Sequence, residues 1–199
     1  MADVRHLSWD TTVMRQAPHD RDPRRRRTRD ALQSAFILLA LERRYHEIHI
    51  DDILKASGVG RSTFYEHFAG KDALLAASMG DALSLLADMP TGESDSRQVA
   101  GLLEHFWKNR ALARSLFQGA ALRVIRNALV QRIEARLDHS DAGRLRLPRR
   151  LAAHALADGM FSPIVAWLSG EAPCSPADLA AALRTTSRAT LASMIAVSN

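Results

Sequence analysis

Apolar residues recur at intervals of three and four along most of the chain, which is the period of an amphipathic α-helix. The first clear case runs from Thr28 to about Arg44. Its apolar face consists of Ala31, Leu32, Ala35, Leu38 and Leu39. No stretch alternates with the period of a β-strand, and no internal repeat is visible. The pattern predicts an all-α protein.

The segment from Ile50 to Phe68 has the pattern of two short helices joined by a tight turn. Apolar side chains that would lock the pair together are Ile50, Ile53, Leu54 and Val59. Gly58 stands where the first helix must stop, a position that often requires a positive φ. Phe64 and Phe68, four residues apart, share the buried face of the second helix. This arrangement predicts a helix-turn-helix, whose second helix enters the DNA major groove.

The outer positions of that second helix carry hydrogen-bonding side chains of a size that reaches phosphates and base edges. Gly60 is a tolerable N-cap there, and it leaves backbone N–H groups free. The candidate DNA contacts on this helix are Gly60, Arg61, Ser62, Thr63, Tyr65 and His67.

The rest of the chain continues as helices separated by short linkers. A helix beginning at Lys71 carries an apolar stripe to about Asp88, and residues 89–96 form a linker rich in Pro, Gly, Ser and acids. Further amphipathic segments are predicted over residues 99–107, 112–117, 122–137, 151–168 and 177–197, with a linker over 139–147. Pro163 is expected to kink or interrupt its helix, because proline cannot donate the helical hydrogen bond.

Composition narrows the class of protein. The 199 residues are 47% hydrophobic and 25% charged, without an apolar run of about eighteen residues, so we expect no membrane span. The start of the chain lacks the apolar core of a secretory signal, and the single Cys174 excludes an internal disulfide. A cytoplasmic protein is the expectation. The sequence shows no catalytic motif and no metal-ligand spacing, so we predict no catalytic residue, metal or cofactor.

Positive charge is concentrated near the amino terminus. The net charge is +5, and the 27 basic residues are 24 Arg and 3 Lys, eight of the Arg preceding Asp30. The run Arg24, Arg25, Arg26 and Arg27, followed by Thr28 as the helix cap, suits an arm that follows phosphates or enters the minor groove. The alternative is a solvated charge run. We predict a flexible arm over residues 1–27.

The run from Asp51 to Leu75, DDILKASGVGRSTFYEHFAGKDALL, resembles the signature of the TetR (tetracycline-repressor) family of transcriptional regulators. The core T-F-Y-x-H-F followed by K-D-A-L-L carries the likeness, which covers roughly Thr28 to Leu75. His49 and Gly60 depart from the Thr and Ser that are usual at the two helix caps. The resemblance implies a three-helix DNA-binding head over residues 28–75, in which Lys71 contacts backbone phosphate, and a helical body over residues 76–199.

The resemblance further implies that the body binds an effector and pairs two subunits. In the family the last two helices form a four-helix bundle across a two-fold axis, and the small residues of the last two helices here fit that role. The alternative is packing within one subunit. A pocket for a small hydrophobic effector would be lined by Phe106, Trp107, Phe117, Leu122, Met160, Phe161 and Trp167. The alternative for these side chains is plain core. His154 and Asp158, four residues apart, suit a surface or dimer-face pair or contact with a ligand or metal.

These patterns predict a sequence-specific DNA-binding transcriptional regulator. The expected form is a homodimeric repressor that binds an inverted-repeat, double-stranded DNA operator and is released by a small-molecule effector. The competing hypothesis is a helical small-molecule-binding protein or enzyme whose head does not bind DNA. No membrane partner is expected.

Overall fold

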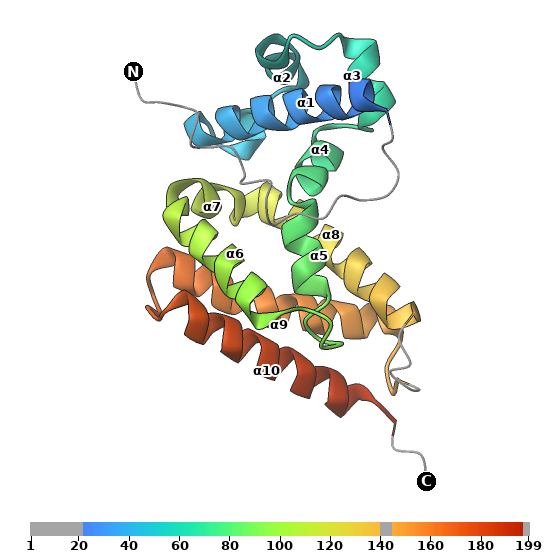
Figure 1. Ribbon diagram of the computed structural model, residues 1–199, viewed down its shortest axis with the longest axis vertical. Helices are drawn as coiled ribbons and strands as arrows, with labels where there is room; N and C mark the ends of the chain where they lie inside the picture. Colours follow the sequence, from blue (N-terminus) through green and yellow to red (C-terminus); the bar gives the residue numbers. More distant parts are fainter. Residues whose placement is uncertain (1–21, 140–144, 197–199) are drawn as a thin grey trace.

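A computed structural model describes residues 22–139 and 145–196 of the chain, and the elements within them are helices joined by short connections (Figure 1). The predicted all-α fold is confirmed. The head contains α1 (Pro23–Glu42), the short 3₁₀ helix η2 (Tyr45–Glu47), α2 (Ile50–Ser57) and α3 (Arg61–His67). The connection to the body is α4 (Lys71–Ser78) and α5 (Gly80–Ala87). The body is built from α6 (Ser96–Lys108), α7 (Arg110–Leu116), α8 (Gly119–His139), α9 (Arg149–Ser169) and α10 (Pro176–Met194).

The head folds around large side chains that are removed from water. The fully buried ones among them are Leu32, Phe36, Ile48, Ile53 and Phe64. Gly58 ends α2 in the left-handed region, with φ +69°, as the sequence predicts, and Gly60 precedes α3 in extended conformation. The predicted helix-turn-helix is therefore present, and its turn depends on the conformational freedom of Gly58.

The start of α1 differs from the prediction. The helix begins at Pro23 because Asp22 caps it, its carboxylate accepting from the backbone N–H of Arg24 at 2.9 Å. Proline suits the first helical position, where its missing N–H costs nothing. Arg24 to Arg27 are therefore a helical turn rather than part of a flexible arm. Thr28 lies inside the helix and donates to the carbonyl oxygen of Arg24 at 3.1 Å, so it is not the cap. The rest of the predicted arm, residues 1–21, lies outside the described residues.

The body packs as layers of helices. The long α8 and α9 lie against each other, α10 packs on both α6 and α9, and α4 and α5 run along α8 (Figure 1). The predicted single helix from Lys71 to Asp88 is interrupted at Met79, where ψ is 6°. Buried leucines on both segments, Leu74 and Leu83 among them, nevertheless keep α4 and α5 on the same core. This pair of helices connects the head physically to the body.

Helix α9 is continuous through Pro163, so of the predicted kink or interruption the interruption is wrong. The residues that follow it, Ile164, Trp167 and Leu168, are buried, and their packing holds the helix together across the missing hydrogen bond. By length and composition α9 is also apolar enough to cross a membrane, but half of its most apolar stretch is buried inside the body. Its apolar sequence is accounted for by its position between α8 and α10.

Candidate nucleic-acid interface

One ridge of α3 faces solvent and carries polar side chains. Arg61, Ser62 and Tyr65 are exposed, and Thr63 and His67 are partly exposed. The opposite face is anchored by Phe64, which is 0% exposed and makes an edge contact with the Tyr65 ring at 5.3 Å between centroids. Because burial of Phe64 fixes the rotation of so short a helix, the polar ridge is held outward. The geometry is that of a recognition helix presented to a groove.

Asp51 holds the side chain of Arg61. The Nη2 group of Arg61 donates to Oδ1 of Asp51, which lies in the first turn of α2. Both side chains remain more than half exposed. The sequence did not predict this contact, because a spacing of ten residues carries no local signal for it. The ion pair restricts where the guanidinium of Arg61 can point while leaving its other donors available.

The basic first turns of α1 lie beside the end of the recognition helix. The guanidinium of Arg29 sits 4.9 Å from the centre of the Phe68 ring, directly after α3, and Figure 1 shows the start of α1 next to α3. Arg24 to Arg27 are exposed there and Thr28 is partly exposed. The structure thus brings this helical run of arginines to the same end of the head as α3. Arg29 is an additional candidate that the sequence interpretation passed over.

Lys71 is placed differently from the phosphate-contacting role that the resemblance implies. Its Nζ donates to the carbonyl oxygens of Tyr45 at 2.8 Å and Ile48 at 2.6 Å, and it lies 4.3 Å from the centre of the Tyr45 ring. Burial lowers the pKa of this ammonium. The Tyr45 hydroxyl in turn donates to Asp72. Lys71 therefore fastens η2 to the start of α4 instead of reaching outward.

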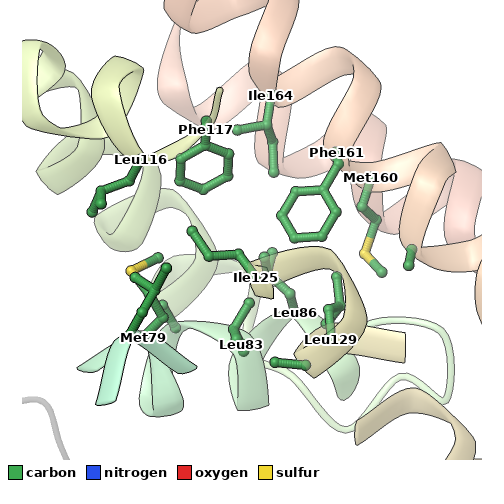
Figure 2. Close-up of a cluster of buried hydrophobic side chains, with 14 of the residues drawn as sticks. Met79, Leu83, Leu86, Leu116, Phe117, Ile125, Leu129, Met160, Phe161 and Ile164 are labelled. Atoms are coloured by element: carbon green, nitrogen blue, oxygen red, sulfur yellow. The ribbon is translucent and has the colours of Figure 1, made fainter. Parts of the chain in front are cut away.

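The side chains predicted to line an effector pocket are largely packed against one another. Phe117 lies 5.5 Å from Phe106 and 5.7 Å from Phe161, in edge contacts between buried rings. Figure 2 shows Phe117, directly after α7, and Phe161 of α9 pointing toward each other, with Met160 close by. Trp167 is buried under Trp107, at 4.8 Å between ring centroids.

Two members of the predicted set differ from the rest. Trp107 is 38% exposed and Leu122 is half-buried. None of the seven predicted residues lines the cleft of about 580 Å³ that lies between head and body. In this arrangement, the set forms core packing rather than the walls of an open pocket.

The structure places Asp158, which is four residues from His154, against Arg126. The carboxylate of Asp158 accepts from both Nε and Nη2 of Arg126 on α8, and this contact lowers its pKa. Within the residues that the structure describes, no three His, Cys, Asp or Glu side chains gather to hold a metal ion. Asp158 joins α8 to α9.

Comparison with known proteins agrees with this geometry. Residues 37–78 match the model of the bacterial regulatory proteins, tetR family. The HTH-type transcriptional regulator YxbF of Bacillus subtilis is 50% identical over 50 residues, which are 25% of this chain but only 13% of that protein. The sequence likeness is therefore concentrated in the head.

Solved structures extend the likeness to the fold of most of the chain. A TetR transcriptional regulator from Streptococcus agalactiae is 24% identical, covering 82% of this chain and 95% of its own, with a TM-score of 0.52. NalD of Pseudomonas aeruginosa, the secondary repressor of the MexAB-OprM multidrug efflux pump, is 22% identical, covering 83% of this chain and 97% of its own, also with a TM-score of 0.52.

Members of the matched family are DNA-binding transcriptional regulators and not enzymes. The helix-turn-helix, the sequence match over it and the shared all-helical architecture agree on one assignment. Over residues 37–78 the chain carries a domain of the tetR family of bacterial regulatory proteins.

Proposed function

We propose that the protein is a homodimeric, ligand-responsive repressor that binds an inverted-repeat DNA operator through α3 of each subunit. The observation that carries the proposal is the outward ridge of Arg61, Ser62 and Tyr65 on a helix anchored by Phe64. The head, residues 23–75, supplies the DNA contacts, and the body, residues 76–199, supplies dimerisation and effector binding. Such a regulator acts in the cytoplasm, where bacterial DNA lies.

In this proposal, different residues of the head contact different parts of the DNA duplex. Arg61, Ser62, Thr63, Tyr65 and His67 face the major groove, and the backbone N–H groups after Gly60 meet a phosphate. Arg24 to Arg29 neutralise the phosphates that flank the groove. Lys71 supports this surface from behind, since two of its three donors are held by Tyr45 and Ile48.

The proposed dimer interface is the small-residue face of α9 and α10. Leu151, Ala155, Gly159 and Ser162 are exposed at helical spacing on α9. Ala181, Thr185, Ala189 and Ala192 repeat that spacing on α10, and they are exposed too. Small side chains let helices approach closely, and a second subunit doubles the base pairs contacted.

Oligomeric state tests this interface. We expect Ala155→Glu combined with Ala189→Glu to give a monomer by sedimentation, because two carboxylates would be forced together across the two-fold axis. Ala56→Glu, on the exposed face of α2, is the matched control and should leave the mass unchanged. A wild-type protein that sediments as a monomer at micromolar concentration would exclude the proposed interface.

The proposed effector is a small hydrophobic molecule that separates the rings of Phe117 and Phe161 on entering the body. These rings lie in a cluster with Met79 and Leu83 of the connecting helices, as Figure 2 shows. A ligand inserted there would displace α4 and α5, and with them the head. Binding would then favour a state in which the two recognition helices are wrongly spaced for successive major grooves.

DNA binding is tested by fluorescence anisotropy with the region upstream of the protein's own gene. We expect salt-sensitive, sequence-dependent binding. The double variant Arg61→Ala with Tyr65→Ala should lose about 1–3 kcal/mol per lost base contact while its circular dichroism is unchanged. Lys108→Ala, on the body, is the control. A folded double variant that binds the operator like the wild type would instead support a protein whose head does not contact DNA.

A further inference from the structure

A cleft of about 580 Å³ lies where the head meets the body. The head contributes Arg44, Tyr45 and His46, at and just before η2. The body contributes Ala111, Arg114 and Ser115 of α7, and Gln118, Gly119 and Ala120 around the start of α8. The volume falls in the range of small-molecule sites. The cleft is separate from the aromatic cluster inside the body.

The cleft is lined by positive and not by negative side chains. Arg44 and Arg114 stand on the head wall and the body wall respectively, and no carboxylate is among the lining residues. Neither arginine takes part in an ion pair within the described part of the chain. The carboxylate of Glu47, outside the lining, accepts from the backbone N–H of Arg44 at 3.0 Å. Two such guanidinium groups at one cavity favour an anion with planar oxygen groups.

Uncharged hydrogen-bond donors in the cleft also favour an anion. The first hydrogen bond of α8 runs from the N–H of Leu122 to the carbonyl of Gln118 at 3.2 Å. The N–H groups of Gly119 and Ala120 therefore precede the helical ladder, at the positive end of a 21-residue helix. The Ser115 hydroxyl and the Gln118 amide lie in the same lining. These donors suit a phosphate or carboxylate group held between the two arginines.

The position of the cleft separates it from the proposed DNA surface. The cleft adjoins η2, which follows the carboxyl end of α1. The contact of Arg29 with Phe68 places the other end of α1 beside the recognition helix, and Figure 1 shows the start of α1 next to α3. A helix of 20 residues is about 30 Å long. A duplex held on α3 would therefore not fill the cleft, and a small molecule is the fitting occupant.

We propose that this cleft binds a small anionic molecule, carrying a phosphate or several carboxylates, that bridges Arg44 of the head and Arg114 of the body. A bound anion fixes the head against α7 and α8. If the head binds DNA as proposed above, the anion and the operator change each other's affinity by the same factor. Only this coupling rests on the proposed function, because anion binding itself needs no DNA.

The test is isothermal titration calorimetry of the full chain with inorganic phosphate and with citrate, at constant ionic strength set by chloride. We expect saturable binding of at least one of the two anions. Arg44→Gln and Arg114→Gln should each weaken it about tenfold or more, since each removes a charged bidentate donor. Arg97→Gln, a 94% exposed arginine of α6, is the charge-matched control and should bind like the wild type.

Three results would overturn the proposal. The first is the lack of saturable binding of both anions. The second is equal weakening by Arg97→Gln and by the two cleft variants, which would show diffuse charge attraction. The Arg61→Ala, Tyr65→Ala variant should keep full anion affinity. A loss there would place the anion on the DNA surface instead, and would also contradict the assignment to the cleft.

Discussion

The ammonium of Lys71 lies over the Tyr45 ring, 4.3 Å from its centre, and donates to the Tyr45 carbonyl oxygen at 2.8 Å. The two residues are separated by 26 positions, so this contact joins the connector after α1 to the first turn of α4. The Tyr45 hydroxyl closes the arrangement by donating to Asp72, and burial with this contact raises the pKa of Tyr45. Lys71, to which the family resemblance assigns a phosphate contact, therefore makes hydrogen bonds inside the head.

We expect Lys71→Met to lower the free energy of unfolding by about 1–3 kcal/mol, because it leaves two carbonyl oxygens without their donor. Urea unfolding measures this. Lys108→Met is the control, since Lys108 is exposed and pairs with Glu104 on its own helix. In the same variant the salt dependence of DNA binding should keep its slope. A shallower salt dependence of DNA binding, with an unchanged free energy of unfolding, would instead indicate that Lys71 contacts a phosphate.

The glycines that flank the turn of the helix-turn-helix give a second prediction. Gly58 has φ +69° and Gly60 has φ −70°, and an added Cβ meets nothing within 4 Å at either position. Gly58→Ala should therefore cost about 1–2 kcal/mol from backbone strain alone. Gly60→Ala should cost less, because it loses only the preference for Gly over Ala at the N-cap of α3. Thermal unfolding of both variants compares them directly. Equal losses would mean that the cost comes from contacts or capping rather than from φ.

Local pattern was sufficient to predict the helix-turn-helix. Gly58 is left-handed, Phe64 and Phe68 are buried on one face, and Arg61 and Tyr65 are exposed on the other. Each of these features follows from neighbours within four residues, and helical periodicity captures such neighbours well. The all-α fold followed for the same reason.

Features that depend on distant partners were not predictable in this way. The role of Lys71 is decided by carbonyl groups 23 and 26 residues away, and that of Asp51 by an arginine ten residues away. The start of α1 was predicted wrongly for a different reason. The four consecutive arginines indicated a flexible arm, whereas Asp22 and Pro23 are typical of a helix N-cap and a first helical residue. Aromatic spacing could not separate a pocket from a packed core, since both require the same residues.

A pH-dependent contribution to stability is expected from the pair of Arg126 and Asp158. The hydrogen bond from Arg126 lowers the pKa of Asp158 below its unfolded value. The stabilisation is therefore present above about pH 4 and is lost as the pH falls through the lower folded pKa. Because both side chains are partly exposed to solvent, the pair contributes less than about 1 kcal/mol.

Urea unfolding of the wild type and of Asp158→Asn at neutral and acidic pH measures this contribution. The difference between the two proteins should be present at neutral pH and vanish in acid. Arg126→Gln should remove the same difference. A difference that persists in acid would assign the effect to packing of the side chain instead.

The ion pair between Asp51 and Arg61 leads to a prediction about specificity. Asp51→Asn removes a negative charge from the DNA-facing surface, so binding to random duplex should become tighter. The same change frees the guanidinium of Arg61, so discrimination at the base it contacts should fall by about 1 kcal/mol, within the range of one side-chain contact. Competition of operator against single-base variants, measured by anisotropy, separates the two effects.

Asp30→Asn is the control for that experiment. Asp30 is an exposed carboxylate of α1, and its removal changes the charge of the head equally without touching Arg61. We expect this control to tighten non-specific binding to a similar extent while leaving base preference as it was. If the two variants discriminate bases alike, Asp51 acts only through its charge. If only Asp51→Asn loses discrimination, the carboxylate orients the arginine that contacts the base, and the specificity of the head depends on a residue outside its recognition helix.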